Sequence, residues 1–127
     1  MQSEEILKHC KMIQTAVDIE VPLGDIDTIE GKMLQLVALM GLSSELMKEA
    51  KNNVLVKQGL IIDIIRREEK GIAPTTMKLI LESRMATELT IYEYCDRLNR
   101  AIVHACDSLR TSISKYKIER ELSTYGK

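Results

Sequence analysis

The sequence is poor in aromatic side chains. None of its 127 residues is Trp or Phe, and only four are Tyr. Aromatic rings normally supply much of the volume of compact cores and of protein interfaces. The bulky apolar residues here are instead Leu, Ile, Val and 7 Met. A core of this kind suits long helices that pack along a seam, so we expect an all-α fold.

Long apolar runs are also absent, because no stretch approaches the roughly 20 apolar residues of a membrane span. The first segment, "MQSEEILKHC", carries acidic residues and lacks the apolar stretch of a signal peptide. The three cysteines of the whole chain cannot all pair with one another. We therefore expect a protein of the reducing cytoplasm that does not enter a membrane.

Catalytic motifs are the third absence. The sequence contains no C-x-x-C, no H-E-x-x-H, no G-x-S-x-G and no glycine-rich phosphate loop. Neither histidine follows a glutamate at the Glu-x-x-His spacing of di-iron bundles. The sequence motifs that usually indicate nucleophilic or metal-dependent catalysis are therefore missing. We expect that the protein is not an enzyme and binds no cofactor and no metal.

The chain reads as a single helical domain over residues 1–127, beginning with a short helix and linker at 1–24. Ser3 is a favourable N-cap, and the apolar periodicity continues to about residue 20. Pro22 then interrupts the helical pattern. Asp27, with a glutamate three residues later, makes an acidic version of the capping box and predicts the start of a second helix.

Two long helices are predicted after this linker. The second helix covers 25–71 and could break at 41–44, where glycine and two serines offer a new start. A hairpin around Gly59 is the alternative within this segment, although the charged flanks favour a continuing helix. The third helix covers 74–123 and begins at Pro74. We expect the two to form an antiparallel hairpin joined at "GIAPTT".

A repeat of 3.5 residues runs along the third helix for about five heptads. The second helix is too broadly apolar for one partner helix to cover it, so we expect a homo-oligomer, either a dimer or a tetramer, together with a protein partner. The seam that we expect to form this oligomer consists of Leu81, Met85, Tyr92, Cys95, Ile102, Cys106, Leu109, Ile113 and Tyr116.

Charge is unevenly distributed along the chain. Residues 1–96 hold 11 Lys and Arg against 16 Asp and Glu, whereas residues 97–127 hold 7 against 3. The basic segment "SLRTSISKYKIERE" therefore raises the alternative of direct DNA binding. Its basic residues scatter around the helix, however, and a phosphate-tracking surface is usually more uniform. The possible nucleic-acid contacts are Arg110, Lys115, Lys117 and Arg120.

Paired carboxylates support an enzyme alternative. Glu45 with Glu49, and Glu93 with Asp96, place two acids one turn apart on each long helix. The pattern is similar to that of all-α nucleoside triphosphate pyrophosphohydrolases, which hold Mg²⁺ and pyrophosphate between ExxE and ExxD motifs. The first pair here is ExxxE, so solvated surface pairs are the better interpretation.

Histidine and cysteine residues suggest zinc as another hypothesis. The candidates are His9, Cys10, Cys95, His104 and Cys106. The two later cysteines share one helix face, whereas His104 points away from them. Buried free thiols are therefore favoured over a metal site.

The order of elements over roughly residues 45–121, with "GIAPTT" between long helices and "SLRTSISKYKIERE" at the end, resembles small helical proteins encoded by phages and prophages. The resemblance implies an accessory protein, with a link to DNA recombination. Together with the absence of catalytic motifs, it predicts a non-enzymatic helical oligomer that mediates protein contacts, as an accessory or inhibitory factor in nucleic-acid metabolism.

Overall fold

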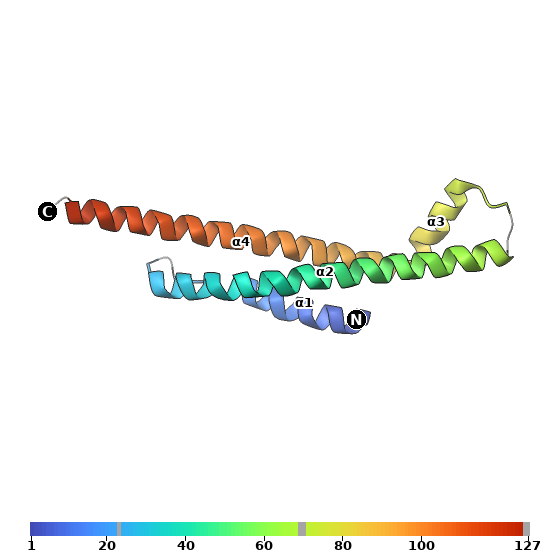
Figure 1. The fold of residues 1–127 in the computed structure, drawn as a ribbon, viewed down its shortest axis with the longest axis horizontal. Coiled ribbons are helices and arrows are strands. Elements are labelled where there is room, and N and C mark those ends of the chain that lie inside the picture. Colours follow the sequence, from blue (N-terminus) through green and yellow to red (C-terminus); the bar gives the residue numbers. More distant parts are fainter. Residues whose placement is uncertain (23, 69–70, 126–127) are drawn as a thin grey trace.

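The computed structural model describes residues 1–22, 24–68 and 71–125. The four helices of this part of the chain are α1 (Ser3–Asp18), α2 (Ile26–Glu68), α3 (Pro74–Arg84) and α4 (Ala86–Tyr125). The two long helices, α2 and α4, run antiparallel, and α1 packs against both of them (Figure 1). The predicted all-α hairpin with a short N-terminal helix is confirmed.

The starts of α1 and α2 differ by a residue or two from the predicted caps. Gln2 is the N-cap of α1, without a side-chain bond, and Ser3 is already helical. Asp25, rather than Asp27, caps α2, because its carboxylate accepts hydrogen bonds from the amide and hydroxyl of Thr28. These two bonds lower the pKa of Asp25 below its ordinary value.

The second helix is continuous through residues 41–44, where the sequence allowed a break. Ser43 is buried, and the serine pair serves the packing of α2 on α4 instead of starting a new helix. Asn99 on α4 places its amide nitrogen 3.3 Å from the hydroxyls of both Ser43 and Ser44. Gly59 also lies inside α2, so the hairpin alternative is wrong.

The segment 74–123, expected as one helix, divides at Met85 into α3 and α4. Met85 has φ −104° and ψ 10°, outside helical geometry, yet its amide still bonds to the carbonyl of Leu81 at 2.9 Å. Met85 is buried against Ile61 and Ile65 of α2. The bend lets α3 fold back over the end of α2, and that packing outweighs the cost of the interrupted helix (Figure 1).

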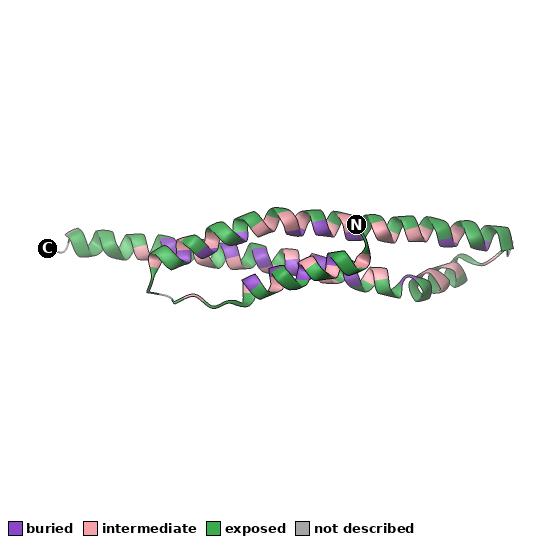
Figure 2. Ribbon diagram, turned by 90° about the horizontal axis from the view of Figure 1, so that it is seen from below, coloured by how far each residue is buried: buried purple, intermediate pink, exposed green. Residues whose placement is uncertain are grey.

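Burial divides the interior into two clusters along the length of the molecule (Figure 2). The larger cluster joins α1, α2 and α4, and its central side chains include Ile13, Leu36 and Ile102. The smaller one joins α2, α3 and the first turns of α4 around Met85. The last turns of α4 extend beyond the start of α2 and are exposed (Figures 1 and 2). Within the described ranges, no helix combines the length and apolar character that crossing a membrane requires.

The accessible surface is large for a chain of this size. It measures 8996 Å², whereas a compact monomer of 14.4 kDa exposes about 6,800 Å² by the usual scaling of area with mass. The excess comes from the elongated shape, which leaves one side of each long helix without cover. Some of that surface is apolar, as described below.

Candidate interaction surface

An exposed stripe runs along the side of α2 that faces away from α1 and α4. Alternating steps of three and four residues keep to one face of a helix, and here they run from Gly31 to Arg66. We call this set the α2 stripe, and all of its members are exposed except the half-buried Ile62. The α2 stripe consists of Gly31, Leu34, Ala38, Gly41, Glu45, Lys48, Asn52, Leu55, Gly59, Ile62 and Arg66.

The α2 stripe has two apolar parts, Leu34 to Gly41 and Leu55 to Ile62, separated by a charged middle, and it ends at Arg66. Leu34 is 69% exposed at one end, and Leu55 is 55% exposed towards the other. Residues 33–44 contain no charged side chain at all. In the middle, Lys48 and Glu45 form an ion pair with 3.5 Å between nitrogen and oxygen. Exposed leucines at both ends of a continuous helix face are typical of a surface that contacts another helix.

Three glycines on the α2 stripe have no role within the chain. A Cβ atom built on Gly31, Gly41 or Gly59 would meet nothing within 4 Å, and none of the three has a positive φ. Each costs roughly 1 kcal/mol of helix stability relative to alanine. Glycine on a helix surface allows the backbone of a second helix to approach closely. The fold of the chain alone therefore gives no reason for these glycines.

The seam on the C-terminal segment is covered within the chain. Five of its nine residues are buried, namely Met85, Cys95, Ile102, Cys106 and Ile113, and the other four are half-buried. Those in the larger cluster pack against α1 and α2. These side chains are thus occupied by the hairpin itself, whereas several bulky apolar side chains of α2 remain exposed.

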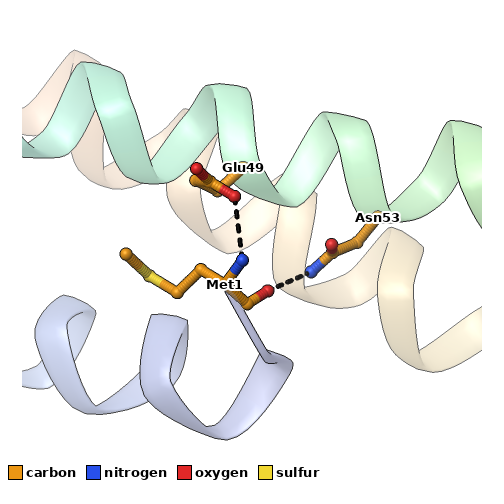
Figure 3. Close-up of polar contacts among 3 residues, drawn as sticks. All are labelled: Met1, Glu49 and Asn53. Carbon is orange, nitrogen blue, oxygen red and sulfur yellow. Dashed lines mark hydrogen bonds and ion pairs between the residues drawn. The ribbon is translucent and has the colours of Figure 1, made fainter.

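Polar contacts at both ends of α1 hold it against α2. The amino group of Met1 lies 3.1 Å from Oε2 of Glu49, and Asn53 donates a hydrogen bond of 3.0 Å to the carbonyl of Met1 (Figure 3). Near the other end, the ammonium group of Lys32 donates to the carbonyl of Ala16. These contacts use the side of α2 next to α1, so they leave the α2 stripe free.

All three cysteines are buried free thiols, as the sequence predicted. Cys10 on α1 and Cys95 on α4 lie with their sulfur atoms 3.5 Å apart. This sulfur contact, together with burial, raises the pKa of the Cys10 thiol well above its ordinary value. Burial also raises the pKa of Cys106. His104 is exposed, so the five zinc candidates do not converge.

Because all three thiols are buried, a thiol reagent should modify them slowly in the folded protein. We expect an aqueous aromatic disulfide to modify them at least about a hundredfold more slowly in buffer than in denaturant, because reaction needs local opening. A Ser108→Cys variant, exposed on α4, is the matched control and should react at once. Equal rates for native and introduced thiols would show that α1 does not stay docked.

Three of the four candidate catalytic carboxylates form ion pairs with separate groups, and the fourth is exposed. Glu45 pairs with Lys48, Glu49 with the amino group of Met1, and Asp96 with Arg100 at 2.5 Å. Glu93 is exposed. Among the residues described by the structure, no three His, Cys, Asp or Glu side chains are grouped so as to hold a metal ion. The geometry therefore gives the pyrophosphohydrolase alternative no support.

The basic residues near the C-terminus do not form a single patch. Arg110, Lys115, Lys117 and Arg120 are all exposed. Arg110 lies 3.4 Å from its neighbour Asp107, and the two lysines, two residues apart, point about 200° away from each other around the helix. Positive charge is therefore spread around α4, with acidic side chains between.

One ion pair joins the two long helices near the smaller cluster. The ammonium of Lys57 on α2 lies 2.7 Å from Oε1 of Glu88 on α4. Its hydrogen bond to Glu88 lowers the pKa of this carboxyl, although desolvation opposes the shift. The other carboxylate oxygen of Glu88 is buried without a hydrogen-bond partner among the described residues. The charge of Glu88 therefore depends on Lys57.

This pair should make the hairpin less stable in acid. Since the folded pKa of Glu88 is lowered from 4.5, its contribution is present above that value and is lost as the pH falls through the lower folded value. We expect the unfolding temperature to fall more between about pH 5 and pH 3 in the wild type than in Lys57→Met. Thermal scans of both proteins by circular dichroism check this. An equal fall in both proteins would assign the acid sensitivity to other carboxylates.

Comparison of the chain with protein-family models, with curated proteins and with solved structures gives no match. The interpretation of function therefore depends on the chain's own geometry. The exposed apolar ends and the glycines of the α2 stripe are among the features that this geometry leaves unexplained.

Proposed function

We propose that this protein is a non-enzymatic, self-associating helical protein whose contact surface is the α2 stripe. The observation that carries the proposal is the exposure of Leu34 and Leu55 on an otherwise unused face of a 43-residue helix. Further support comes from the large accessible surface, because an elongated chain gains more from association than a compact one.

Apolar burial supplies the driving force for this association. Leu60 and Val56, on the flank of the α2 stripe, are 60% and 55% exposed and would widen the contact. Covering one such side chain contributes of the order of 1 kcal/mol or more at roughly 25 cal/mol per Å². Several of them on each copy are enough to offset part of the entropy lost on association.

Sedimentation equilibrium over a wide concentration range tests the proposal. We expect the mass to rise from 14.4 kDa at low concentration towards a multiple of that value, as mass action requires. A mass of one chain at every concentration would refute self-association. A turnover assay on nucleotide triphosphates with Mg²⁺, in the wild type and in Glu93→Gln, tests the enzyme alternative separately.

The accessory role in nucleic-acid metabolism rests on the resemblance to phage-encoded proteins, and the exposed basic residues of α4 are its only physical support. Fluorescence anisotropy with labelled single- and double-stranded DNA at two salt concentrations tests direct binding. Saturable binding that weakens steeply with salt would assign a phosphate-binding role to α4. No binding at low salt would leave protein contact as the means of action.

A further inference from the structure

We infer that the occupant of the α2 stripe is the α2 stripe of a second copy, packed antiparallel about a twofold axis near Lys48. This inference rests on the proposed function and adds to it the orientation and register of the contact. It follows from the order of residues along the stripe, which is complementary to its own reverse.

In this register, the bulky Leu55 of each copy faces a glycine of the other copy, whereas Gly59 and Leu34 face small or apolar residues. Residues whose numbers add up to about 96 or 97 lie opposite each other when the axis passes near Lys48. Leu55 then faces Gly41, where a Cβ would have nothing within 4 Å in the single chain. Likewise Gly59 faces Ala38, a contact of two small residues that lets the backbones approach. Leu34 faces Ile62, which closes the apolar layer at each end.

Charges in the middle of the α2 stripe agree with the same register. Glu45 of one copy lies opposite Lys51 and Asn52 of the other, and Lys51 is exposed. The two Lys48 side chains meet at the axis, each held by the ion pair with its own Glu45. Glu45 of each copy therefore faces a positive charge of the other copy, while the apolar layers lie on either side of this charged centre. A parallel arrangement would also place Lys48 against Lys48, but it would set Glu45 against Glu45 and each glycine against the same glycine.

The size of this contact sets the expected affinity. From Gly31 to Arg66 the stripe is about 50 Å long, and a helix is about 10 Å wide, so each copy covers roughly 500 Å². A pair therefore buries roughly 1,000 Å², the lower limit for a specific interface. We expect a dimer that dissociates in the micromolar range rather than a permanent one.

Site-directed cross-linking with a short bismaleimide tests the orientation at a concentration where sedimentation shows dimer. Lys48→Cys places two thiols next to each other at the axis and should yield a covalent dimer. Leu34→Cys places them about 42 Å apart in an antiparallel pair, at 1.5 Å for each of 28 residues, and should yield none. The wild type, whose own thiols are buried, shows the background.

The outcomes separate this inference from the proposed function. Efficient cross-linking of Leu34→Cys would indicate a parallel pair and overturn the inference, although self-association would stand. A dimer in sedimentation without cross-linking of Lys48→Cys would place the contact on another face and overturn it as well. A monomer at all concentrations would overturn both the inference and the proposed function.

Substitution of Gly41 tests the register. In Gly41→Ala we expect a higher unfolding temperature for the dilute monomer, since the added methyl meets nothing within 4 Å. The dimer dissociation constant should rise by about tenfold, because the methyl occupies the space of the opposing Leu55. Gly31→Ala, at the end of the stripe, should show the same thermal gain with an unchanged dissociation constant. An unchanged constant in Gly41→Ala would contradict the register.

Discussion

Replacing Leu34 and Leu55 together by glutamate makes the protein monomeric at concentrations where the wild type is dimeric. A dimer of this variant would bury four carboxylates without partners, and an unpaired buried charge costs several kcal/mol. We expect the dissociation constant to rise at least about a hundredfold, equivalent to about 2.8 kcal/mol. Sedimentation velocity over a concentration series measures it.

The fold of the single chain should tolerate both changes. Leu34 and Leu55 are 69% and 55% exposed, and substitutions at such positions usually alter stability by no more than about 0.5 kcal/mol. Leu79→Glu on α3 and Ile118→Glu on α4 are matched controls, because both side chains are similarly exposed but lie outside α2. If a control variant dissociated the dimer and the double variant did not, the contact surface would lie elsewhere.

Shortening Ile102 to alanine should destabilise the chain more than any surface substitution. Ile102 is 0% exposed and lies on α4 in the cluster that joins α1, α2 and α4. Truncation of a buried isoleucine costs roughly 2–5 kcal/mol, through lost transfer energy and the cavity that remains. We expect the unfolding temperature to fall by about 10 °C or more.

The neighbouring Val103 provides the control for this substitution. It follows Ile102 on the same helix turn but is 40% exposed, so Val103→Ala should change stability only slightly. Chemical denaturation of both variants, followed by helical circular dichroism, gives the two free energies of unfolding. Similar values for the two variants would mean that the side of α4 that faces the core has been misassigned.

The sequence predicted the hairpin well because its signals are local. The apolar repeat along the C-terminal segment identifies nine residues, of which the structure buries five and half-buries four, and Pro74 begins α3 as predicted. Gly71 has a φ of 89°, the left-handed conformation that the turn requires and that glycine adopts without strain. Periodicity and turn residues were therefore sufficient for the topology.

Two features depended on contacts between distant residues and were not visible in the sequence. The division at Met85 arises because α3 packs on Ile61 and Ile65 of α2, although the local pattern continues as one helix. The α2 stripe was not recognisable in the sequence because the charged residues Glu45 and Lys48 lie between its two apolar parts. The sequence showed that this helix is broadly apolar, but only the structure separates its covered side from its exposed side.

Because the hairpin itself covers the C-terminal seam, variants of the seam residues test the stability of the single chain rather than its association. Leu109 is half-buried and Ile113 is buried within the hairpin, so aspartate at either position should reduce the stability of the single chain. Loss of an oligomer in those variants would follow from unfolding. Variants of the α2 stripe separate the two effects, because its side chains are exposed in the single chain.

The measurement that tests the central claim most directly is the rate at which a maleimide modifies Ala38→Cys at low and at high protein concentration. Ala38 is exposed on the α2 stripe, and Ser108→Cys, exposed on α4, is the reference. If α2 forms the contact, the rate for Ala38→Cys falls as the dimer forms, while the rate for Ser108→Cys stays constant. Rates for Ala38→Cys that do not change with concentration, while the mass doubles, would contradict the assignment of the contact to α2.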